Sequence, residues 1–402
     1  MLPRLALLSL LCPLVAPAAE KDRNDLPNVF STRPQTLAKV KQRLADGDKD
    51  LKAAYDKLIA DADRALKQKA ESVMDKPKAG PSGDKHDYVS YAPYWWPDPK
   101  KKDGLPYIQK DGERNQEAVK DGDRPAFGRV LGAAQTLSLA YYLSGKEEYA
   151  EHAALLLRTW FLDPRMRMNP HFDNAQVVRG VNEGRGTGLI EFASMLGLVD
   201  SLGLLECSKN WTDADRKEMR AWLEKYALWL ATSKNGKDEK AATNNHGTWY
   251  DVQSVALALY LGRRDDARKQ CEAAKARLAA QITPEGKQPR ELTRADSFSY
   301  SVFNLRAWFT LATLAERVDV DLWQYETKDG RSLHRALGFL LPYLDEKNKW
   351  PTSQKKPIRT KDLIALLWQG RQVYGDKECQ KWLDTLTAVD LAASRIALYH
   401  PR

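Results

Sequence analysis

Two short segments contain side chains that could move a proton and hold an anion. The first is 243–250, which includes Asn245 and His246, and the second includes Arg294 and Tyr300 about fifty residues later. An amide and a guanidinium can stabilise a carboxylate as negative charge develops on it. An imidazole or a phenol can take or give the proton. This set of groups suits removal of a proton from the carbon beside a carboxylate.

The first segment is expected to open a helix near Gly247, directly after the polar, basic stretch 234–242. A helix N-terminus presents free N–H groups and the positive end of a dipole, which favour a bound carboxylate. Histidine ordinarily titrates near neutrality, so His246 could serve as a base. In the competing interpretation, Asn244 or Asn245 only caps the helix and His246 is a packed surface residue.

Arg294 and Tyr300 lie six residues apart, a spacing that does not place them on one helical face. They can converge if a turn separates them, and Asp296-Ser297 is suitable for one. A cation beside Tyr300 is expected to lower the pKa of this phenol and make the phenolate accessible. Arg290 is a second candidate for the cation. The competing interpretation is a core tyrosine at the start of a helix.

A polar, glycine-rich segment between residues 168 and 188 is predicted to form one wall of a sugar-binding cleft. Its glycines allow the backbone to approach a ligand closely. It lacks the lysine-serine/threonine pair of a Walker phosphate loop. A simple connection between helices is the alternative. The candidate sugar contacts in this segment are His171, Gln176, Arg179 and Arg185.

The segment 74–125 is predicted to be a long, ordered lid loop over the cleft. Six prolines between Pro77 and Pro106 exclude a helix, and its aromatic residues argue against disorder. Aromatic rings can stack on sugar rings, or they can wedge a loop onto the core. The aromatic candidates for sugar contact are Tyr91, Tyr94, Trp95 and Trp96, together with Trp249 and Tyr250 beside the Asn-His pair.

The bulk composition is that of a globular protein with a basic surface. The chain has 402 residues, 43% of them hydrophobic, and 63 lysines and arginines against 54 acids give a net charge of +9. A basic charge suits an anionic partner, whether polyuronate, nucleic acid or an anionic cell surface. It also serves solubility, so charge alone does not choose among these classes.

The first nineteen residues have the pattern of a secretory signal. Arg4 precedes an apolar run from Leu5 to Val15, and small residues at 16–19 suit signal-peptidase cleavage. This predicts one mature domain, 20–402, in the periplasm or outside the cell. No later segment is expected to be apolar enough to cross a bilayer.

Cysteine and histidine spacing gives no metal or cofactor motif. After the predicted signal segment, which contains Cys12, the chain keeps three cysteines, Cys207, Cys271 and Cys379. This odd number and the wide spacing favour free thiols, with one incidental disulfide as the alternative. The histidines lack zinc-site spacing, and no nucleophile elbow is visible. Neither a metal nor a cofactor is therefore expected.

Hydrophobic residues recurring at three- and four-residue steps predict an all-α protein of antiparallel helix pairs. Two helices are expected between Gln35 and Glu71. Further predicted helices are Phe127–Leu143, Glu147–Phe161, Gly188–Leu202, Asp213–Thr232, His246–Leu261, Asp265–Ile282, Tyr300–Arg317, Ser332–Leu344 and Lys361–Tyr374. Paired helices at a spacing of roughly forty residues suggest a helical toroid or solenoid.

Several of these segments together resemble the alginate-lyase superfamily, in particular polysaccharide lyase families five and thirty-eight, and most closely family thirty-eight. The resemblance rests on residues 90–99, Met168-Asn169-Pro170, 184–188, 244–249, and Arg294 with Tyr300. It implies an (α/α) toroid or barrel with a deep cleft under the lid loop. It also implies metal-independent β-elimination of a 1,4-linked polyuronate that leaves 4,5-unsaturated ends.

The resemblance also assigns roles within the site. Asn245 and Arg294 would neutralise the uronate carboxylate, His246 would be base or neutraliser, and Tyr300 would be the acid or both acid and base. The implied substrate is mannuronan, mixed alginate or glucuronan.

Two other functions compete with the lyase. A helical-toroid glycoside hydrolase would need two carboxylates in the cleft. A non-catalytic envelope protein that binds anionic glycans would need none. A nucleic-acid partner is disfavoured because the basic residues are scattered and the chain carries an export signal. The carboxylates that a hydrolase could use are Glu183, Glu191, Glu291 and Asp296.

Overall fold

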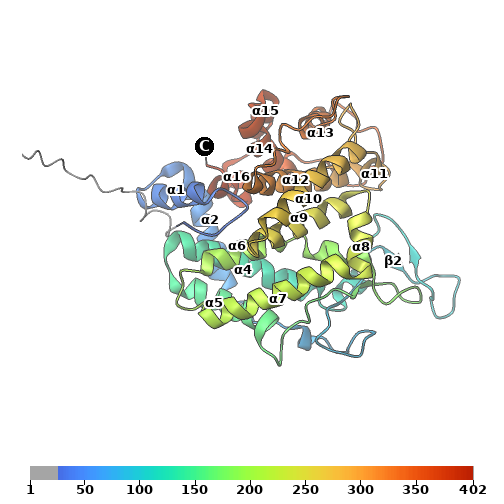
Figure 1. Cartoon of the computed structure of the whole chain (residues 1–402). Coiled ribbons are helices and arrows are strands. Elements are labelled where there is room, and N and C mark those ends of the chain that lie inside the picture. The colour runs from blue at the N-terminus through green and yellow to red at the C-terminus, as the bar shows by residue number, and fades with distance from the viewer. Residues whose placement is uncertain (1–25, 402) are drawn as a thin grey trace, which may run out of the picture.

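Helices form most of the regular structure in the computed structural model, which describes residues 26–401 (Figure 1). The predicted signal segment 1–19 lies outside the described residues. The α-helices are α1 (Pro34–Ala45), α2 (Lys49–Ala65), α3 (Gln116–Lys120), α4 (Arg124–Ser144), α5 (Glu147–Leu157), α6 (Met195–Leu205), α7 (Asp213–Thr232), α8 (Lys234–Ala241), α9 (Asn245–Tyr260), α10 (Arg264–Gln281), α11 (Pro289–Leu292), α12 (Ser297–Ala315), α13 (Leu333–Leu340), α14 (Ile364–Tyr374), α15 (Lys377–Leu383), α16 (Ala388–Ser394) and α17 (Ile396–Tyr399).

Shorter elements connect and extend these helices. The 3₁₀ helices are η1 (Val73–Asp75), η3 (Gly186–Phe192), η4 (Glu316–Val318), η5 (Leu341–Leu344) and η6 (Thr360–Leu363), and η2 (Arg158–Leu162) is a π-helical turn. The strands are β1 (Val89–Tyr91), β2 (Trp95–Trp96), β3 (Ile108–Gln109) and β4 (Asn174–Val177).

The helical prediction is confirmed for most of the chain, because helical periodicity and capping residues are read locally. The helix α7 has the predicted bounds, and its start is set by a capping box in which Thr212 and Asp215 bond to each other's backbone N–H groups. The predicted break at residues 46–48 separates α1 from α2. The helix α12 begins three residues before the predicted start, at Ser297.

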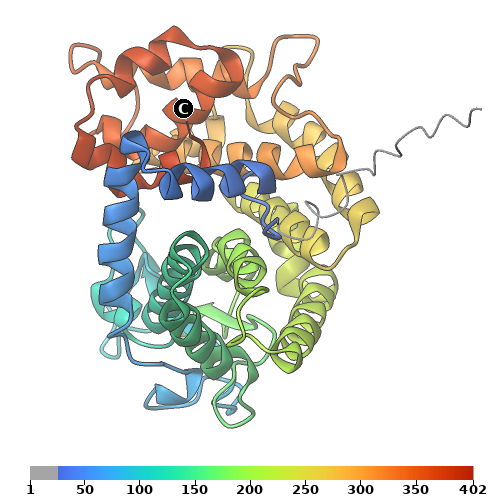
Figure 2. The same cartoon turned by 90° about the vertical axis from the view of Figure 1, so that its left-hand side faces the viewer.

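The helix α9 lies deep in the protein, where it contacts α6, α10 and α12. One continuous cluster of buried hydrophobic residues extends from Val29 to Leu398. The N-terminal helices α1 and α2 pack against the C-terminal helices α16 and α17, and Figure 2 shows these two ends of the chain side by side. The N-terminus of α9 is therefore held by a large, well-packed core.

The lid loop carries short strands that the sequence did not predict. The strand β1 pairs in parallel with β4, and β2 pairs antiparallel with β3 to form a hairpin. Each strand has two to four residues, too few for an alternating pattern to be recognised, and three of them lie among prolines and glycines. The β1–β4 pairing joins the lid loop to the segment that was predicted as a cleft wall.

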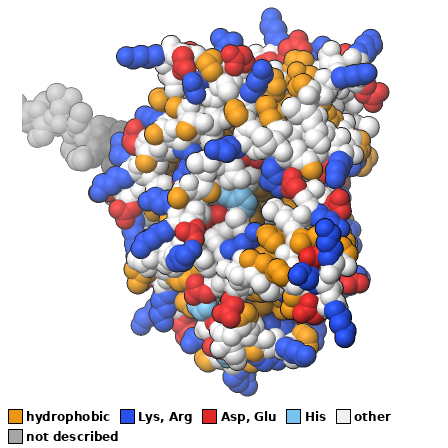
Figure 3. Space-filling view, turned by 90° about the vertical axis from the view of Figure 1, so that its right-hand side faces the viewer, with side chains coloured by type: hydrophobic (Ala, Val, Ile, Leu, Met, Phe, Trp, Pro, Cys, Tyr) orange, Lys and Arg blue, Asp and Glu red, His pale blue; other side chains and the backbone are white. Residues whose placement is uncertain are grey.

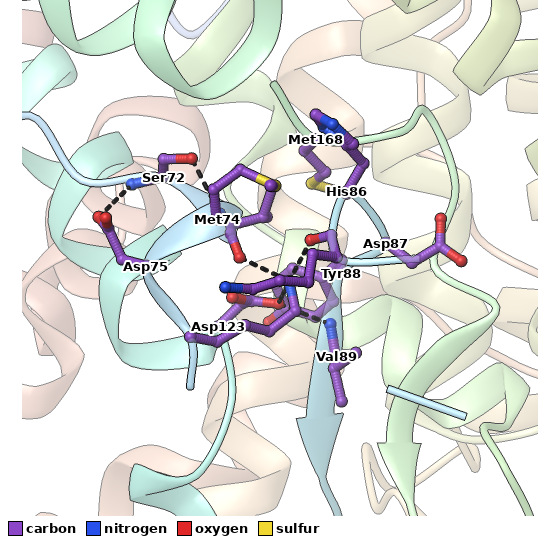
Figure 4. A network of polar contacts seen from close by, with 12 residues as sticks. Ser72, Met74, Asp75, His86, Asp87, Tyr88, Val89, Asp123 and Met168 are labelled. Carbon is purple, nitrogen blue, oxygen red and sulfur yellow. Dashed lines mark hydrogen bonds and ion pairs between the residues drawn. The ribbon is translucent and has the colours of Figure 1, made fainter. Parts of the chain in front are cut away.

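A buried ion pair joins the two ends of the lid loop (Figure 4). The Nζ atom of Lys76 lies 3.1 Å from Oδ2 of Asp123, and it donates hydrogen bonds to the carbonyls of Val73 and Lys85. The backbone N–H of Val89 donates to the same Asp123 carboxylate at 2.8 Å. Burial raises the pKa of Asp123 to about 6, although Lys76 opposes this rise. This ion pair therefore holds residues 76 and 123, at the two ends of the lid loop, next to each other.

Two sequence expectations about the region after residue 185 were wrong. The helix predicted from Gly188 starts instead as the 3₁₀ helix η3 and becomes α-helical at Met195. Gly188 lies so close to Ala175 that a side chain there would collide with it. The stretch Gly186–Leu205 is also long and apolar enough to span a membrane by composition, but 72% of its apolar window is buried inside the fold. It behaves as a core segment.

Candidate active site

The N-terminus of α9 presents His246 with one ring nitrogen engaged. The side chain of Asn244 caps the helix by accepting from the backbone N–H of His246 at 3.3 Å. The imidazole Nδ1 lies 2.7 Å from Oε1 of Glu239, which belongs to α8. The polar, basic stretch 234–242 is therefore largely the helix α8, which the sequence did not predict. Within residues 26–401, Nε2 of His246 has no hydrogen-bond partner.

The neighbouring Asn245 is held by a second glutamate. Its backbone N–H donates to Oε1 of Glu291 at 2.7 Å, and its side-chain Nδ2 donates to Oε2 of the same carboxylate at 2.9 Å. Asn245 and Glu291 are each only 1% exposed. Burial raises the pKa of Glu291, and the two Asn245 donors partly offset this rise. The Asn245 amide therefore has a fixed orientation.

Arg294 and Tyr300 converge across the turn between α11 and α12, the arrangement that the sequence allowed if a turn separated them. The Nη2 of Arg294 donates to the Tyr300 hydroxyl at 2.8 Å, and its guanidinium lies 3.7 Å from the centre of the phenol ring. The Tyr300 hydroxyl donates in turn to the Tyr94 hydroxyl at 3.0 Å. Arg290 is exposed, so Arg294 is the cation beside the phenol.

The predicted effect on the Tyr300 pKa was wrong in sign. Burial raises the pKa of Tyr300, and the hydrogen bond to Tyr94 raises it further, while Arg294 pushes it down without outweighing them. The expectation considered only the cation, because the burial of the ring cannot be read from local sequence. In this structure Tyr300 holds its proton, which suits a proton donor.

Contacts from the lid loop reach this cluster directly. Tyr94 bonds to Tyr300, and the carboxylate of Asp111 accepts from Nη2 and Nε of Arg294 at 2.6 and 3.2 Å. Asp111 also accepts from the backbone N–H of Ala295 at 2.9 Å. Arg294 holds the pKa of Asp111 below its usual value. The loop therefore packs against the catalytic candidates and not on another side of the molecule.

The two halves of the candidate site meet around Glu291. This carboxylate bonds to Asn245, and it also lies close enough to Arg294 and His246 for both to lower its pKa. Figure 3 shows the face of the molecule on which α8, α11 and β2 lie in Figure 1. A histidine side chain surfaces near its centre, beside a hollow flanked by lysine and arginine side chains. All four predicted catalytic residues thus belong to one region.

Three of the predicted sugar contacts form a second group beside the first. Nη2 of Arg185 donates to the side chain of Gln176 at 2.8 Å, and its guanidinium lies 5.8 Å from the ring of Trp95. The Nε atom of Arg185 is buried and has no hydrogen-bond partner among residues 26–401. Glu239, the partner of His246, acts on the pKa of Arg185, which places this group near His246.

Other predicted sugar contacts are occupied by protein partners. Arg179 stacks on Tyr91 at 4.6 Å and bonds to Tyr107 and Asp121 of the lid loop. Nε2 of His171 lies 2.9 Å from Asp87. These side chains tie the lid loop to the helical body.

The two aromatic residues after the Asn-His pair are core residues. Tyr250 is 4% exposed and its hydroxyl bonds to the carbonyl of Leu230, so its assignment as a sugar contact was wrong. Trp249 is 8% exposed and packs on Phe303 with ring centres 5.2 Å apart. Both lie along α9, whose side chains after the first turn point into the core.

The carboxylates considered for a hydrolase do not form a free pair. Glu291 is engaged by Asn245, Glu191 contacts Tyr88 and Arg124, and Asp296 accepts from residues 355 and 356. Glu183 is exposed. Among residues 26–401, no group of three or more His, Cys, Asp and Glu side chains could hold a metal ion. The described cysteines are free thiols, with Cys271 and Cys379 buried and Cys207 exposed.

Comparison with known proteins decides the family. The profile of the family described as alginate lyase matches residues 72–350. A crystal structure of an alginate lyase from Bacteroides ovatus has 40% sequence identity and a TM-score of 0.88, and the match covers 93% of this chain and 99% of that one. The chain belongs to the alginate lyase family. A separate comparison with curated proteins found no match.

More distant alginate lyases share the fold. Alginate lyase A1-III from Sphingomonas species A1 has 19% identity and a TM-score of 0.56, with 90% of this chain and 93% of that one covered. A variant of A1-III complexed with a tetrasaccharide reaches a TM-score of 0.60 at 19% identity, covering 96% and 99% of the two chains. The predicted helical toroid is confirmed, and the protein is a polysaccharide lyase.

Sequence reasoning missed two residues of this lyase site, Asp111 and Glu239, and it considered Glu291 only as a possible acid of a hydrolase and not as the partner of Asn245. Asp111 lies 183 residues from Arg294, and Glu291 lies 46 residues from Asn245. No local pattern connects such distant positions. Glu239 is only seven residues before His246, but it was hidden in a stretch interpreted as merely polar and basic.

Proposed function

We propose that the protein cleaves a 1,4-linked polyuronate by β-elimination at the cluster of Asn245, His246, Arg294 and Tyr300. The observation that supports this most strongly is the Tyr300 hydroxyl, which keeps its proton while Arg294 and Tyr94 hold it at 2.8 and 3.0 Å. A positioned phenol with a transferable proton is what departure of a glycosidic oxygen requires.

In the proposed reaction, Asn245 and Arg294 stabilise the uronate carboxylate, which makes the C5 proton acidic enough to remove. Nε2 of His246, which has no partner in residues 26–401, takes that proton. The electron pair forms the C4–C5 double bond as the bond from C4 to the glycosidic oxygen breaks. That oxygen takes the proton of Tyr300, and proton exchange with water restores both side chains.

Arg294 must exchange partners for this to occur. In the structure its guanidinium is already bound by the carboxylate of Asp111, at 2.6 and 3.2 Å. A uronate carboxylate can share or displace this ligand because an arginine fork binds carboxylates in the same planar way. Since Asp111 belongs to the lid loop, arrival of the polymer and movement of the loop would be linked.

Cleavage is expected to appear as ultraviolet absorbance, because a C4–C5 double bond conjugates with the carboxylate. We propose alginate as the first polymer to test, since the solved relatives are named alginate lyases. Incubation with polymannuronate, mixed alginate and glucuronan should give a rise in absorbance with at least one of them. EDTA should leave the rate unchanged, because side chains rather than a metal neutralise the carboxylate. Saturable binding of all three polymers without any product would contradict the proposal.

The lid loop is proposed to close over the polymer with Trp95 facing the sugar. Trp95 lies near Arg185, and its indole N–H is buried without a partner in residues 26–401. Trp96 instead donates to the carbonyl of Glu113 at 2.9 Å, within the loop itself. These contacts give the two neighbouring tryptophans different roles.

Replacing Trp95 by alanine should therefore raise KM for the polymer several-fold and change the melting temperature little. A ring that stacks on a sugar contributes to binding and not to the fold. Trp96→Ala is the matched control and should lower the melting temperature more than it raises KM. Thermal melts and initial rates on both variants measure this. The proposal fails if Trp95→Ala unfolds early while its folded fraction keeps normal KM.

Export and partners remain part of the proposal. We propose that the signal-like segment 1–19 directs the chain to the periplasm or the medium, where the mature domain 20–402 acts on an anionic polysaccharide. The net charge of +9 favours encounter with a polyanion. No nucleic-acid or membrane partner is proposed.

A further inference from the structure

Two buried glutamates stand directly behind the two adjacent residues that open α9. Glu239 lies 2.7 Å from Nδ1 of His246, and Glu291 accepts two hydrogen bonds from Asn245 at 2.7 and 2.9 Å. Both carboxylates are only 1% exposed. They come from different helices, α8 and α11, which meet at the N-terminus of α9.

Burial of two carboxylates at this position lowers the stability of the fold, so a functional reason for it is expected. Burying a carboxylate is unfavourable unless it is paired and hydrogen-bonded. Two such groups also repel an anionic substrate that must bind next to them. Within residues 26–401, neither Glu239 nor Glu291 forms an ion pair with a lysine or arginine. They therefore differ from the many structural ion pairs elsewhere in the protein, such as Lys76–Asp123.

Each carboxylate instead fixes an orientation that its neighbour could otherwise lose. An imidazole can rotate and exchange tautomers, and an acceptor at Nδ1 holds the proton on that atom and leaves Nε2 for the substrate. A side-chain amide can flip, and an acceptor at Nδ2 prevents this. Glu291 binds the backbone and side-chain donors of Asn245 together, so that the amide is fixed relative to the helix start.

We propose that Glu239 and Glu291 are positioning residues of the lyase reaction, which hold His246 and Asn245 in the geometry needed for proton removal and carboxylate stabilisation. This inference rests on the proposed function. It adds two residues that do not touch the substrate but act through residues that do. The competing view is that Glu291 only satisfies the first N–H of α9 and that Glu239 only fills space.

Replacement of each glutamate by glutamine distinguishes these two interpretations, because glutamine keeps the size of the side chain and one acceptor oxygen. In Glu291→Gln, the remaining oxygen can still accept from the Asn245 backbone, but the new NH₂ group faces Nδ2 of Asn245. The amide must then flip or lose its partner, while the helix start stays satisfied. In Glu239→Gln, the negative charge that favours a proton on Nδ1 is removed, and the amide can present its NH₂ group to Nδ1 instead of its oxygen, so that the tautomer with a free Nε2 is no longer enforced.

The proposal predicts that each glutamine variant lowers kcat by roughly 10–100-fold, the range seen when residues that orient functional ligands are replaced. KM should stay within about twofold and the melting temperature within a few degrees, because binding and packing are retained. Steady-state kinetics on the polyuronate that the wild-type protein cleaves, together with thermal melts, measure all three quantities.

Asp200→Asn is the matched control. Asp200 is also a buried carboxylate that accepts two hydrogen bonds, from the backbone N–H groups of Phe30 and Ser31, but it tethers the N-terminal segment rather than the site. This variant should lower the melting temperature and leave kcat unchanged. If kcat falls in proportion to stability in all three variants, or stays normal in either glutamine variant, the inference is overturned. A wild-type protein that cleaves no polyuronate would instead overturn the proposed function.

Discussion

Tyr300→Phe is expected to lower kcat by about 10²–10⁴-fold while binding of a uronate oligosaccharide is retained. The substitution removes the proton that the leaving oxygen needs, and the ring keeps its place under Arg294, whose guanidinium lies 3.7 Å from the ring centre. Because burial raises the pKa of Tyr300, the hydroxyl is protonated in the resting enzyme. Steady-state kinetics and direct binding to the oligosaccharide measure the two effects separately.

The matched control for Tyr300→Phe removes a tyrosine hydroxyl outside the candidate site. Tyr250 lies in the core, where its hydroxyl meets the carbonyl of Leu230, so that Tyr250→Phe should leave kcat unchanged. Tyr94→Phe should have an intermediate effect, because it removes only the acceptor of the Tyr300 hydrogen bond. Wild-type turnover in Tyr300→Phe would show that another group donates the proton.

Asn245→Ala should lower kcat by about 10²–10³-fold, the effect of removing a preorganised donor to a developing negative charge. The substitution also leaves the Glu291 carboxylate with only the backbone N–H of residue 245 as a partner, in a site that must accept an anion. The loss should be larger in kcat than in KM, since the charge on the carboxylate group grows in the transition state. Kinetics on the polymer measure the ratio.

Asn244→Ala provides the comparison for this variant. Asn244 is the neighbouring asparagine, and its side chain caps α9 by accepting from the backbone N–H of His246 at 3.3 Å. Loss of such a cap costs about 1 kcal/mol of stability. Asn244→Ala should therefore lower the melting temperature more than it lowers turnover. Equal kinetic effects of the two substitutions would mean that Asn245 serves the helix start and not the substrate.

The helices were predictable because their signals are local. The capping box of Thr212 and the periodicity of α7 are complete within one segment, and the predicted bounds are those of the structure. The 3₁₀ start at η3 was not predictable, since it depends on how closely Gly188 approaches Ala175. The strand β1 of the lid loop likewise exists only because it pairs with β4, which lies more than eighty residues away.

The residue types of the candidate site were predictable from the sequence, but the residues that hold them in place were not. The turn between Arg294 and Tyr300 could be inferred from Asp296-Ser297, and the structure places the two side chains in contact. The contacts of Glu291 with Asn245 and of Asp111 with Arg294 could not be inferred, because the partners are 46 and 183 residues apart in the chain. The sign of the Tyr300 pKa shift was missed for the same reason, since burial is a property of the whole fold.

The tightest test of the central claim is the mass of the reaction products. After the wild-type protein has acted on a defined uronate oligosaccharide, mass spectrometry should find two fragments whose masses add up to that of the substrate. Elimination by His246 and Tyr300 adds no water, so the fragment with the new non-reducing end should carry the C4–C5 double bond. Fragments whose summed mass exceeds that of the substrate by one water molecule would indicate hydrolysis and would contradict the account.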